Sequence, residues 1–264
     1  MNKNDYRTVK LTKGEVNVYD FGSVKLHAYK TDDPMSDEVY VLEKNGKFVV
    51  LESPCFYDNE AALGEYLSSK EVAGMLIAYH AAGGKFLPGV KKYATAGAKA
   101  YGENGGGKAL INGFTAAFGS AFDENIHEIT DIIDGGKTVI GGIEFDVKPN
   151  DEAYTVYTPE INAVYTHMLG HDCHSIVAGA GHADAIIAEL NGYIADGVNF
   201  ILTSHYTPED LKDAETKIAY LKDLKNIAAR VKNAGEFKAE VEKNYPDYCG
   251  ENYLDMTAGM FFKD

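Results

Sequence analysis

Three closely spaced histidines, His167, His171 and His174, are the first residues in this chain with a spacing suited to metal chemistry. They lie four and three residues apart, so a helical turn would place all three imidazoles on one face, with Asp172 beside them. Imidazoles at this spacing suit zinc, nickel, copper or iron. Gly170 weakens the assumption of a helix. The alternative is an irregular loop whose histidines are hydrogen-bonded or solvated.

Two further histidines each follow an apolar strand. The run 75–78 leads to His80, and the run 199–204 leads to His205. Open α/β architectures collect ligands at strand ends along one sheet edge, so we expect these two imidazoles to share a pocket. Three tyrosines flank the candidate histidines and could line a substrate pocket or simply pack within strands: Tyr79, Tyr165 and Tyr206.

The elements that must position these residues begin with short strands. Asn45-Gly46 separates two apolar runs and predicts a hairpin with a type I′ turn. Helices are expected over 59–70 and 109–122, with the Gly-rich segment 102–108 as a surface connection. The strands expected in this half lie near 9–11, 16–19, 24–29, 39–43, 48–52, 75–78 and 92–95.

The second half starts again with strands and ends in helices. Strands are expected near 129–133, 137–140, 143–147, 153–157 and 163–166. A helix over 183–196 precedes the strand that ends at His205, and a long helix is expected from about Pro208 to Gly235. Two halves, each made of strands followed by helices, indicate two packed sheets with helices outside.

Five segments stand in the order found in one known superfamily. They are a hairpin ending in Glu52-Ser-Pro54, the loop His80-Ala-Ala-Gly-Gly84, a second hairpin at 134–147, two strands at 156–166, and a strand ending in Ser204-His205 before Pro208. In this order the chain resembles the metallo-β-lactamase-fold hydrolases from about residue 37 to 232. The resemblance implies an α/β (α+β) fold, a four-layer αββα sandwich of two mixed β-sheets flanked by helices.

The resemblance also implies a metal centre, although most of its ligand positions hold other residues. The superfamily's first motif usually reads Thr/Ser-His-x-His-x-Asp-His, and here only its His80 remains. A catalytic zinc site needs about three protein ligands and an open position, so this chain could hold one divalent ion, zinc, iron or manganese, but not a binuclear centre. The candidate ligands are His80, His167, His205, His171 and His174, with Asp151 and Asp172 as further donors.

Two functions follow from this donor set. The first is a metal-dependent hydrolase with a remodelled mononuclear site acting on a small ester, lactone, amide or phosphoester. The second is a catalytically inactive pseudo-enzyme that keeps the fold, has lost the metal, and binds a small molecule or a protein partner. A third option, Cys173 as a thiolate nucleophile activated by the adjacent His174, has less support because neighbouring residues rarely orient in that way. No catalytic residue is assigned from the sequence.

Composition limits the class of protein. A chain of 264 residues with a net charge of -15 is not expected to bind nucleic acid or an anionic membrane. The lysines near 217–232 interleave with acidic and apolar residues and indicate a solvated helix face. Cys55, Cys173 and Cys249 contain no C-x-x-C pair, which fits reduced thiols in a cytoplasmic protein.

Residues 1–264 are expected to form one domain. Its aromatic C-terminal segment, about 236–264, is too apolar for a disordered end, so we expect it to pack on the domain or at a homodimer interface.

Overall fold

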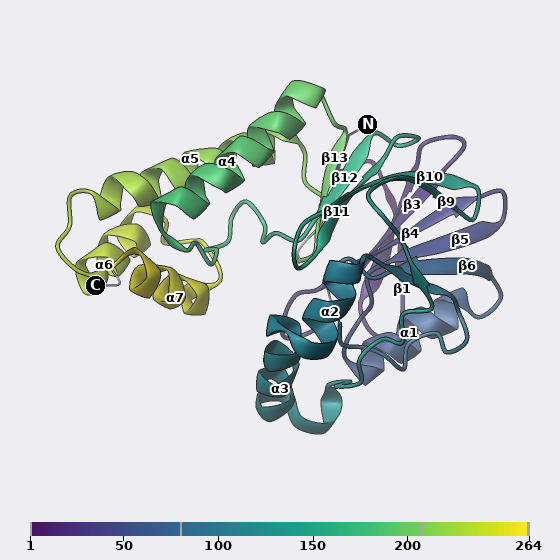
Figure 1. Cartoon of the computed structure of the whole chain (residues 1–264). Helices are drawn as coiled ribbons and strands as arrows, with labels where there is room; N and C mark the ends of the chain where they lie inside the picture. Colours follow the sequence, from purple (N-terminus) through teal and green to yellow (C-terminus); the bar gives the residue numbers. More distant parts are fainter. Residues whose placement is uncertain (1, 80, 206, 263–264) are drawn as a thin grey trace. The chain divides into compact units, whose positions relative to one another are not determined.

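The computed structural model describes residues 2–79, 81–205 and 207–262 (Figure 1). Contacts divide the chain into two compact units. Unit 1 comprises Met1–Met168 and Leu202–Pro208, and unit 2 comprises Leu169–Ile201 and Glu209–Asp264. The candidate ligand His80 and the candidate pocket residue Tyr206 lie outside the described residues.

Unit 1 begins with an eight-stranded sheet whose strands follow one another in sequence order. β1 to β5 pair antiparallel, and β5 to β8 pair parallel. The predicted type I′ hairpin is confirmed, because Asn45 and Gly46 join β4 to β5 with φ of 51° and 78°. The strands are β1 (Arg7–Lys10), β2 (Glu15–Asp20), β3 (Lys25–Lys30), β4 (Glu38–Lys44), β5 (Lys47–Leu51), β6 (Glu71–Leu76), β7 (Lys92–Ala94) and β8 (Asp131–Ile132).

The change to parallel pairing follows from a helical crossover. α1 (Tyr57–Leu67) connects β5 to β6, and such a connection is what a parallel pair requires. Its residues Leu63 and Leu67 belong to the same buried apolar cluster as Val50 of β5 and Met75 of β6. The helix predicted here therefore exists, although it begins two residues earlier and ends three residues earlier than expected.

The Gly-rich segment 102–108 lies largely at the surface as predicted, but it is mostly helical and interrupts the helical region only at Gly105. α2 (Ala96–Asn104) and α3 (Gly106–Phe118) are separated only by Gly105, and a short 3-10 turn, η1 (Gly119–Ala121), follows. The glycines are needed here because the Tyr101 ring lies against the first turn of α3. A Cβ at Gly106 or Gly107 would come within 2.8 or 3.0 Å of that ring. These glycines therefore allow the helices to pack closely.

The second sheet has the strand order β13-β12-β11-β10-β9. Its first hairpin turns at Gly141-Gly142, with φ of 60° and 80°, as the sequence predicts. The pairs from β9 to β12 are all antiparallel. The strands are β9 (Gly136–Ile140), β10 (Ile143–Pro149), β11 (Tyr154–Thr158), β12 (Ala163–Thr166) and β13 (Phe200–Thr203).

The two sheets face each other within unit 1. Gly74 of β6 has no space for a side chain, because a Cβ there would lie 2.7 Å from the Tyr93 ring and 3.0 Å from the Ile140 side chain of the second sheet. At the edge, the Lys44 ammonium forms an ion pair with Glu160 at 2.6 Å. The prediction of two packed sheets is therefore confirmed.

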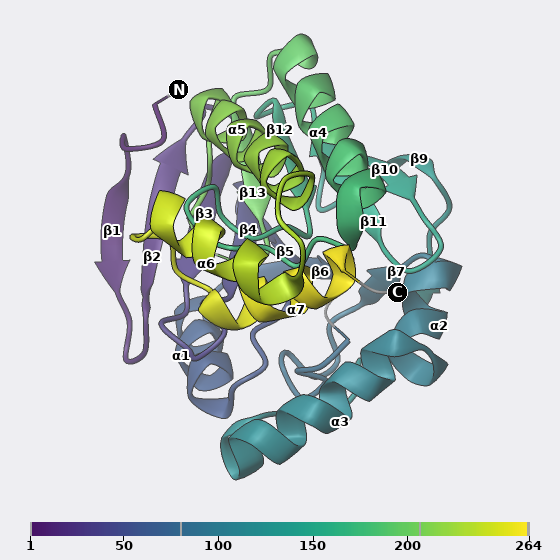
Figure 2. The ribbon, with the colours of Figure 1, turned by 90° about the vertical axis from the view of Figure 1, so that its left-hand side faces the viewer.

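Unit 2 is mainly helical, with α4 (Gly179–Asp196), α5 (Leu211–Ala228), α6 (Ala234–Asn244) and α7 (Glu251–Phe261). Figure 1 and Figure 2 show α4 and α5 side by side, with α6 and α7 at one end of this pair. Phe237 of α6 and Leu254 of α7 are fully buried in one apolar cluster with Leu221 of α5. The aromatic C-terminal segment is thus part of the core of unit 2.

The long helix expected from Pro208 to Gly235 is wrong at both ends. α5 begins at Leu211, because Asp210 accepts hydrogen bonds from the backbone of Lys212 and Asp213 in a capping box. It ends at Ala228, and α6 starts separately with Asn233 as its N-cap. None of the helices in the described part of the chain is long and apolar enough to cross a bilayer.

Candidate functional site

Strands β12 and β13 each lead to a histidine that the sequence identified as a candidate metal ligand. His167 directly follows β12, and His205 follows β13 after Ser204. The two imidazole rings meet edge to face, with centroids 5.3 Å apart and planes at 68°. His167 is exposed, whereas His205 is only 9% exposed. Two of the five predicted histidine ligands are therefore neighbours within unit 1.

Backbone pairing and two acceptors fix the His205 ring. Asp37 and His205 form an antiparallel bridge. Nδ1 of His205 lies 3.0 Å from the Met35 carbonyl oxygen and 3.1 Å from Oδ1 of Asp37. Because both partners accept hydrogen bonds, Nδ1 carries a proton, and in the neutral ring the lone pair is then on Nε2. Sequence reasoning missed Asp37, since nothing local connects it to a histidine 168 positions away.

The surroundings of the His205 ring are acidic. Burial lowers the pKa of His205, but hydrogen bonding and charge from Asp37 outweigh burial, and the pKa is raised overall. Burial and the charge of Asp37 raise the pKa of Asp33 to about 6. Asp37 also accepts a hydrogen bond from the Cys55 thiol at 3.2 Å, and burial raises the pKa of that thiol well above its usual value. Cys55 is therefore not a reactive thiol.

His167 is fixed by a hydroxyl and by an aromatic ring. Its Nδ1 lies 2.5 Å from Oγ of Ser204, and its ring stacks on Tyr79 with centroids 3.8 Å apart. The Tyr79 hydroxyl in turn shares a hydrogen bond with the Tyr101 hydroxyl at 2.8 Å. Burial and this hydrogen bond raise the pKa of Tyr79, so it stays protonated. The predicted pocket residue Tyr79 therefore contacts a candidate ligand directly.

Glu52 holds the backbone that leads from β6 toward His80. It is fully buried at the end of β5, and its Oε1 accepts hydrogen bonds from the backbone N–H groups of Ala78 at 3.0 Å and Tyr79 at 2.8 Å. The Tyr165 hydroxyl donates to the same oxygen at 3.0 Å. Glu52 has φ of 69°, a conformation that is uncommon for a residue with a side chain. The superfamily resemblance places Glu52 near the position of the usual Asp, and its role here is to fix this loop.

The predicted pocket tyrosines have different surroundings. Tyr165 is 1% exposed with its hydroxyl on Glu52 and its ring edge-on to Tyr40, so it packs inside the unit. Tyr79 lines a small pocket together with Gly102 and other residues from α2 and the loops beside it. Of the two described tyrosines, Tyr79 is therefore the one positioned to meet a ligand.

The other two predicted histidines in the described part of the chain, His171 and His174, lie in unit 2 and are held by other partners. Of the two alternatives for His167, His171 and His174, the irregular loop is the one found, because residues 167–178 contain no helical turn. Nδ1 of His171 lies 2.8 Å from Glu209 Oε1, and Nδ1 of His174 lies 2.9 Å from the Tyr220 hydroxyl. The hydrogen bond to Glu209 raises the pKa of His171, whereas burial lowers the pKa of His174.

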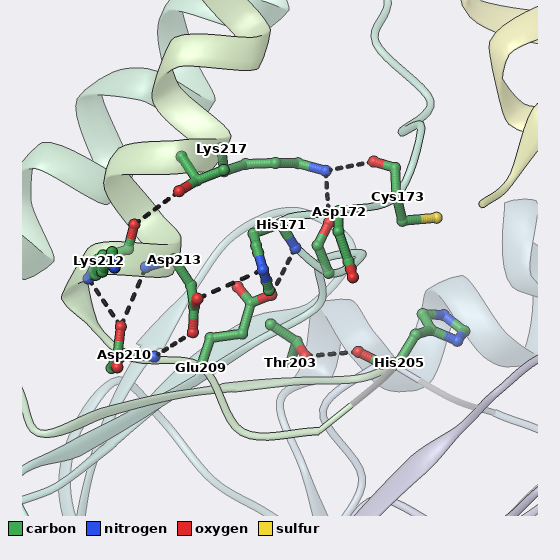
Figure 3. Close-up of polar contacts among 12 residues, drawn as sticks. His171, Asp172, Cys173, Thr203, His205, Glu209, Asp210, Lys212, Asp213 and Lys217 are labelled. Carbon is green, nitrogen blue, oxygen red and sulfur yellow. Dashed lines mark hydrogen bonds and ion pairs between the residues drawn. The ribbon is translucent and has the colours of Figure 1, made fainter. Parts of the chain in front are cut away.

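Lys217 explains why the 167–178 segment is not helical. Its ammonium group donates to the carbonyl oxygen of Cys173 at 2.9 Å (Figure 3). It also donates to the carbonyl oxygen of Gly170 at 2.8 Å, and a helix would use both carbonyls internally. Lys217 is only 1% exposed, so its assignment to a solvated helix face is wrong. Burial lowers its pKa to about 8. The sequence did indicate that Lys217 is buried. Lys217 lies three residues after Ala214 and four before Leu221, which places it on the apolar side of α5.

The other predicted donors are exposed or buried without a catalytic arrangement. Asp151 is exposed in the turn between β10 and β11, and Asp172 is exposed in unit 2. Cys173 is fully buried and donates to the His174 carbonyl, while the His174 ring faces Tyr220, so the Cys173 nucleophile is not supported by the geometry. Within residues 2–79, 81–205 and 207–262, no group of three or more His, Cys, Asp or Glu side chains is placed to hold a metal ion.

The fold is that of known structures. A stereoselective inverting sec-alkylsulfatase from Pseudomonas sp. is similar, with a TM-score of 0.63 and 13% identity over 98% of this chain and 58% of its own. A metallo-β-lactamase family protein from Thermus thermophilus gives 0.62 and 14% over 90% of this chain and 91% of its own. A metallo-β-lactamase from Erythrobacter litoralis gives 0.55 and 13% over 82% of this chain and 100% of its own.

These similarities confirm the predicted fold class, α/β with two mixed sheets of the metallo-β-lactamase type. The chain spans little more than half the length of the alkylsulfatase. No protein-family model matches the sequence, and no curated protein does. The chain therefore has the metallo-β-lactamase fold at only 13–14% sequence identity to these structures.

Proposed function

We propose that this chain is a metal-dependent hydrolase with one divalent ion held at the pair His167 and His205. The observation that carries this proposal is that both rings use Nδ1 for a hydrogen bond to the protein while lying 5.3 Å apart. A metal-ligating histidine almost always donates its other ring nitrogen to a carboxylate, a carbonyl or water. His205 has both a carboxylate and a carbonyl at Nδ1, which supports Nε2 as its ligating atom.

The sequence offers a third imidazole for the same site. His80 directly follows Tyr79, whose ring stacks on His167. Consecutive Cα atoms are about 3.8 Å apart, so His80 is bonded to a residue that already contacts one of the two proposed ligands. Three imidazoles are the ligand number that a catalytic zinc site uses. We therefore assign His80, His167 and His205 as the ligand set, with zinc, iron or manganese as the ion.

The protein's own residues would position and shield such a centre. Asp37 holds the His205 ring in one tautomer, Tyr79 supports the face of His167, and Glu52 fixes the loop before His80. A bound divalent ion supplies Lewis acidity and lowers the pKa of the water that it binds. The exposed position of His167 supports access for a small ester, lactone, amide or phosphoester.

A pseudo-enzyme is the second candidate, and one observation favours it. The described residues include no group of three metal donors, and the loop after position 80 has Ala81 and Ala82 where the resembling superfamily has ligands. In this case the pocket beside Tyr79 would bind a small molecule, or the surface would bind a protein partner, without hydrolysis.

Metal content separates the two candidates. The protein, purified without a metal-binding tag, should contain about one equivalent of zinc, iron or manganese by inductively coupled plasma mass spectrometry, since the site offers three ligands. His205→Ala should lose this metal, and Asp37→Asn should weaken binding by about 10–100-fold. His171→Ala is the matched control and should retain the metal, because His171 is held by Glu209 in unit 2. Circular dichroism confirms that each variant is folded.

A folded wild-type protein that takes up none of these ions overturns the hydrolase proposal, and so does full metal retention in His205→Ala. The metal-loaded protein is then screened with esters, lactones, amides and phosphoesters. Sulfate esters belong in this screen, because one of the similar structures is an alkylsulfatase. Hydrolysis that a chelator abolishes and added metal restores would exclude the pseudo-enzyme.

A further inference from the structure

Cys173 and Cys249 are 76 positions apart in sequence but paired through their backbones in unit 2. They form an isolated parallel β-bridge. The Cys249 N–H donates to the Asp172 carbonyl at 3.3 Å, and the His174 N–H donates to the Cys249 carbonyl at 2.8 Å. Paired residues in a parallel bridge point their side chains to the same side. No local motif signals this pairing, since neither cysteine lies in a C-x-x-C pair.

The spacing usual for a β-bridge suits a disulfide. Hydrogen-bonded strands lie about 4.7–4.9 Å apart, inside the range of about 4.4–6.8 Å between Cα atoms across which a disulfide closes. Gly250 shows how closely the segments pack. It has φ of 79°, and a Cβ there would lie 2.7 Å from the Cys173 sulfur and 3.0 Å from the His174 carbonyl oxygen.

The two thiols differ in access to solvent, which suits a stepwise oxidation. Cys249 is exposed, whereas Cys173 is fully buried. Both are thiols in this structure, and their sulfurs point toward different carbonyls: Cys249 toward Asp172 at 3.8 Å and Cys173 toward His174 at 3.3 Å. Closing a disulfide would require the exposed Cys249 sulfur to turn from the Asp172 carbonyl toward Cys173.

We propose that Cys173 and Cys249 form a site of reversible thiol oxidation, closing an internal disulfide when the protein meets a low-molecular-weight disulfide such as oxidised glutathione. The Cys249 thiolate attacks one glutathione sulfur, the glutathione S–S bond breaks, and one glutathione thiolate leaves. The Cys173 thiolate then attacks the Cys249 sulfur and releases the second glutathione. The two protein thiols lose two protons and two electrons in total, and oxidised glutathione gains them.

A disulfide between Cys173 and Cys249 would join two segments of unit 2 that contact different helices. The carbonyl of Cys173 is held by the Lys217 ammonium group on α5, while Cys249 lies in the connection between α6 and α7. A disulfide here ties the 170–175 segment to that connection and closes a loop of more than 70 residues. Closing a long loop restricts the unfolded chain, so oxidation stabilises unit 2.

The test uses the full-length native protein incubated with oxidised glutathione and then treated with a thiol-alkylating reagent under denaturing conditions. Two of the three cysteines should resist alkylation, and mass spectrometry of the digest should find one peptide pair joining positions 173 and 249. The melting temperature of the oxidised protein should rise by about 3–10 °C and return to its starting value after reduction.

Cys55→Ser is the matched control and should oxidise like the wild type, because Cys55 is buried against Asp37 in unit 1. Cys249→Ser should form no internal link and show no thermal shift. The proposal is overturned if Cys249 is recovered only as a mixed disulfide with glutathione or as a link between two chains. It is also overturned if all three cysteines remain alkylatable, or if the link includes Cys55.

Discussion

Glu52 supports the most discriminating mutational test of this fold, because one carboxylate oxygen satisfies three donors, of which two are buried and one, on Tyr79, is half-buried. Ala78 N–H, Tyr79 N–H and the Tyr165 hydroxyl all donate to its Oε1 at 2.8–3.0 Å. Glu52→Ala removes the acceptor and leaves all three donors inside the protein. An unsatisfied buried donor costs about 1–3 kcal/mol, so the two buried donors, on Ala78 and Tyr165, predict a loss of about 2–6 kcal/mol in the free energy of unfolding. Typical total stabilities are only about 5–15 kcal/mol.

Glu52→Gln isolates the role of the charge. Glutamine keeps the side-chain volume and an acceptor oxygen. Because Ala and Gln both have a Cβ, the backbone strain at position 52 is the same in Glu52→Ala and Glu52→Gln and cancels when the two are compared. Hydrogen bonds to a charged group are stronger than neutral ones by about 1–2 kcal/mol, and we expect a loss of that size. Glu71→Ala is the control, because its side chain is 67% exposed in a surface ion pair, and it should change stability by less than about 0.5 kcal/mol.

Urea denaturation followed by circular dichroism measures these differences, with an unchanged m-value as the sign that the denatured state is unaffected. Amide hydrogen exchange at Ala78 and Tyr79 provides a local readout, since both N–H groups should lose protection in Glu52→Ala. The reasoning is refuted if Glu52→Ala is no less stable than Glu71→Ala, or if the two amides remain fully protected.

Three further outcomes can be checked by the same denaturation assay. Burial and a neighbouring carboxylate raise the pKa of Glu60 from 4.5 to about 8, so the folded state binds the extra proton and stability falls as pH rises through this window. Glu60→Gln should therefore stabilise the protein by about 1–3 kcal/mol at pH 9 and by nothing near pH 4, with the exposed Glu65→Gln as control. Burial lowers the pKa of Lys217 from 10.5 to about 8, so the unfolded state binds the extra proton and stability should rise with pH between these values, a slope that Lys217→Met removes. Gly83→Ala should destabilise by about 2 kcal/mol more than Gly89→Ala, because both have φ above 80° but only at Gly83 would a Cβ lie 2.3 Å from a backbone oxygen; equal losses would contradict this contact.

Local sequence patterns predicted most of the elements of this fold. Alternating apolar residues and turn pairs such as Asn45-Gly46 and Gly141-Gly142 placed both hairpins correctly. A two-residue turn with positive φ is determined by the two residues in the turn, and glycine and asparagine favour that conformation. Helix ends were less accurate. The end of α5 and the joint at Gly105 depend on capping contacts and on the Tyr101 ring, which periodicity does not reveal.

The candidate site also combines features that local sequence predicted with features that only tertiary contacts determine. Sequence identified His167 and His205 as residues that follow strands, but it also grouped His167 with His171 and His174 by spacing alone. The tertiary structure separated them, because the Lys217 ammonium group and the Glu209 carboxylate, more than 35 positions away, bind backbone groups of the 170–173 segment that a helical turn would have used.

The sequence by itself determined which residues could ligate a metal and roughly where the strands lie, since both depend on residue type and near neighbours. Only the tertiary structure decided that Asp37 orients His205, that Glu52 supports the loop before His80, and that Cys249 pairs with Cys173. These partners are brought together by chain folding, and the residues around each of them carry no local trace of the other.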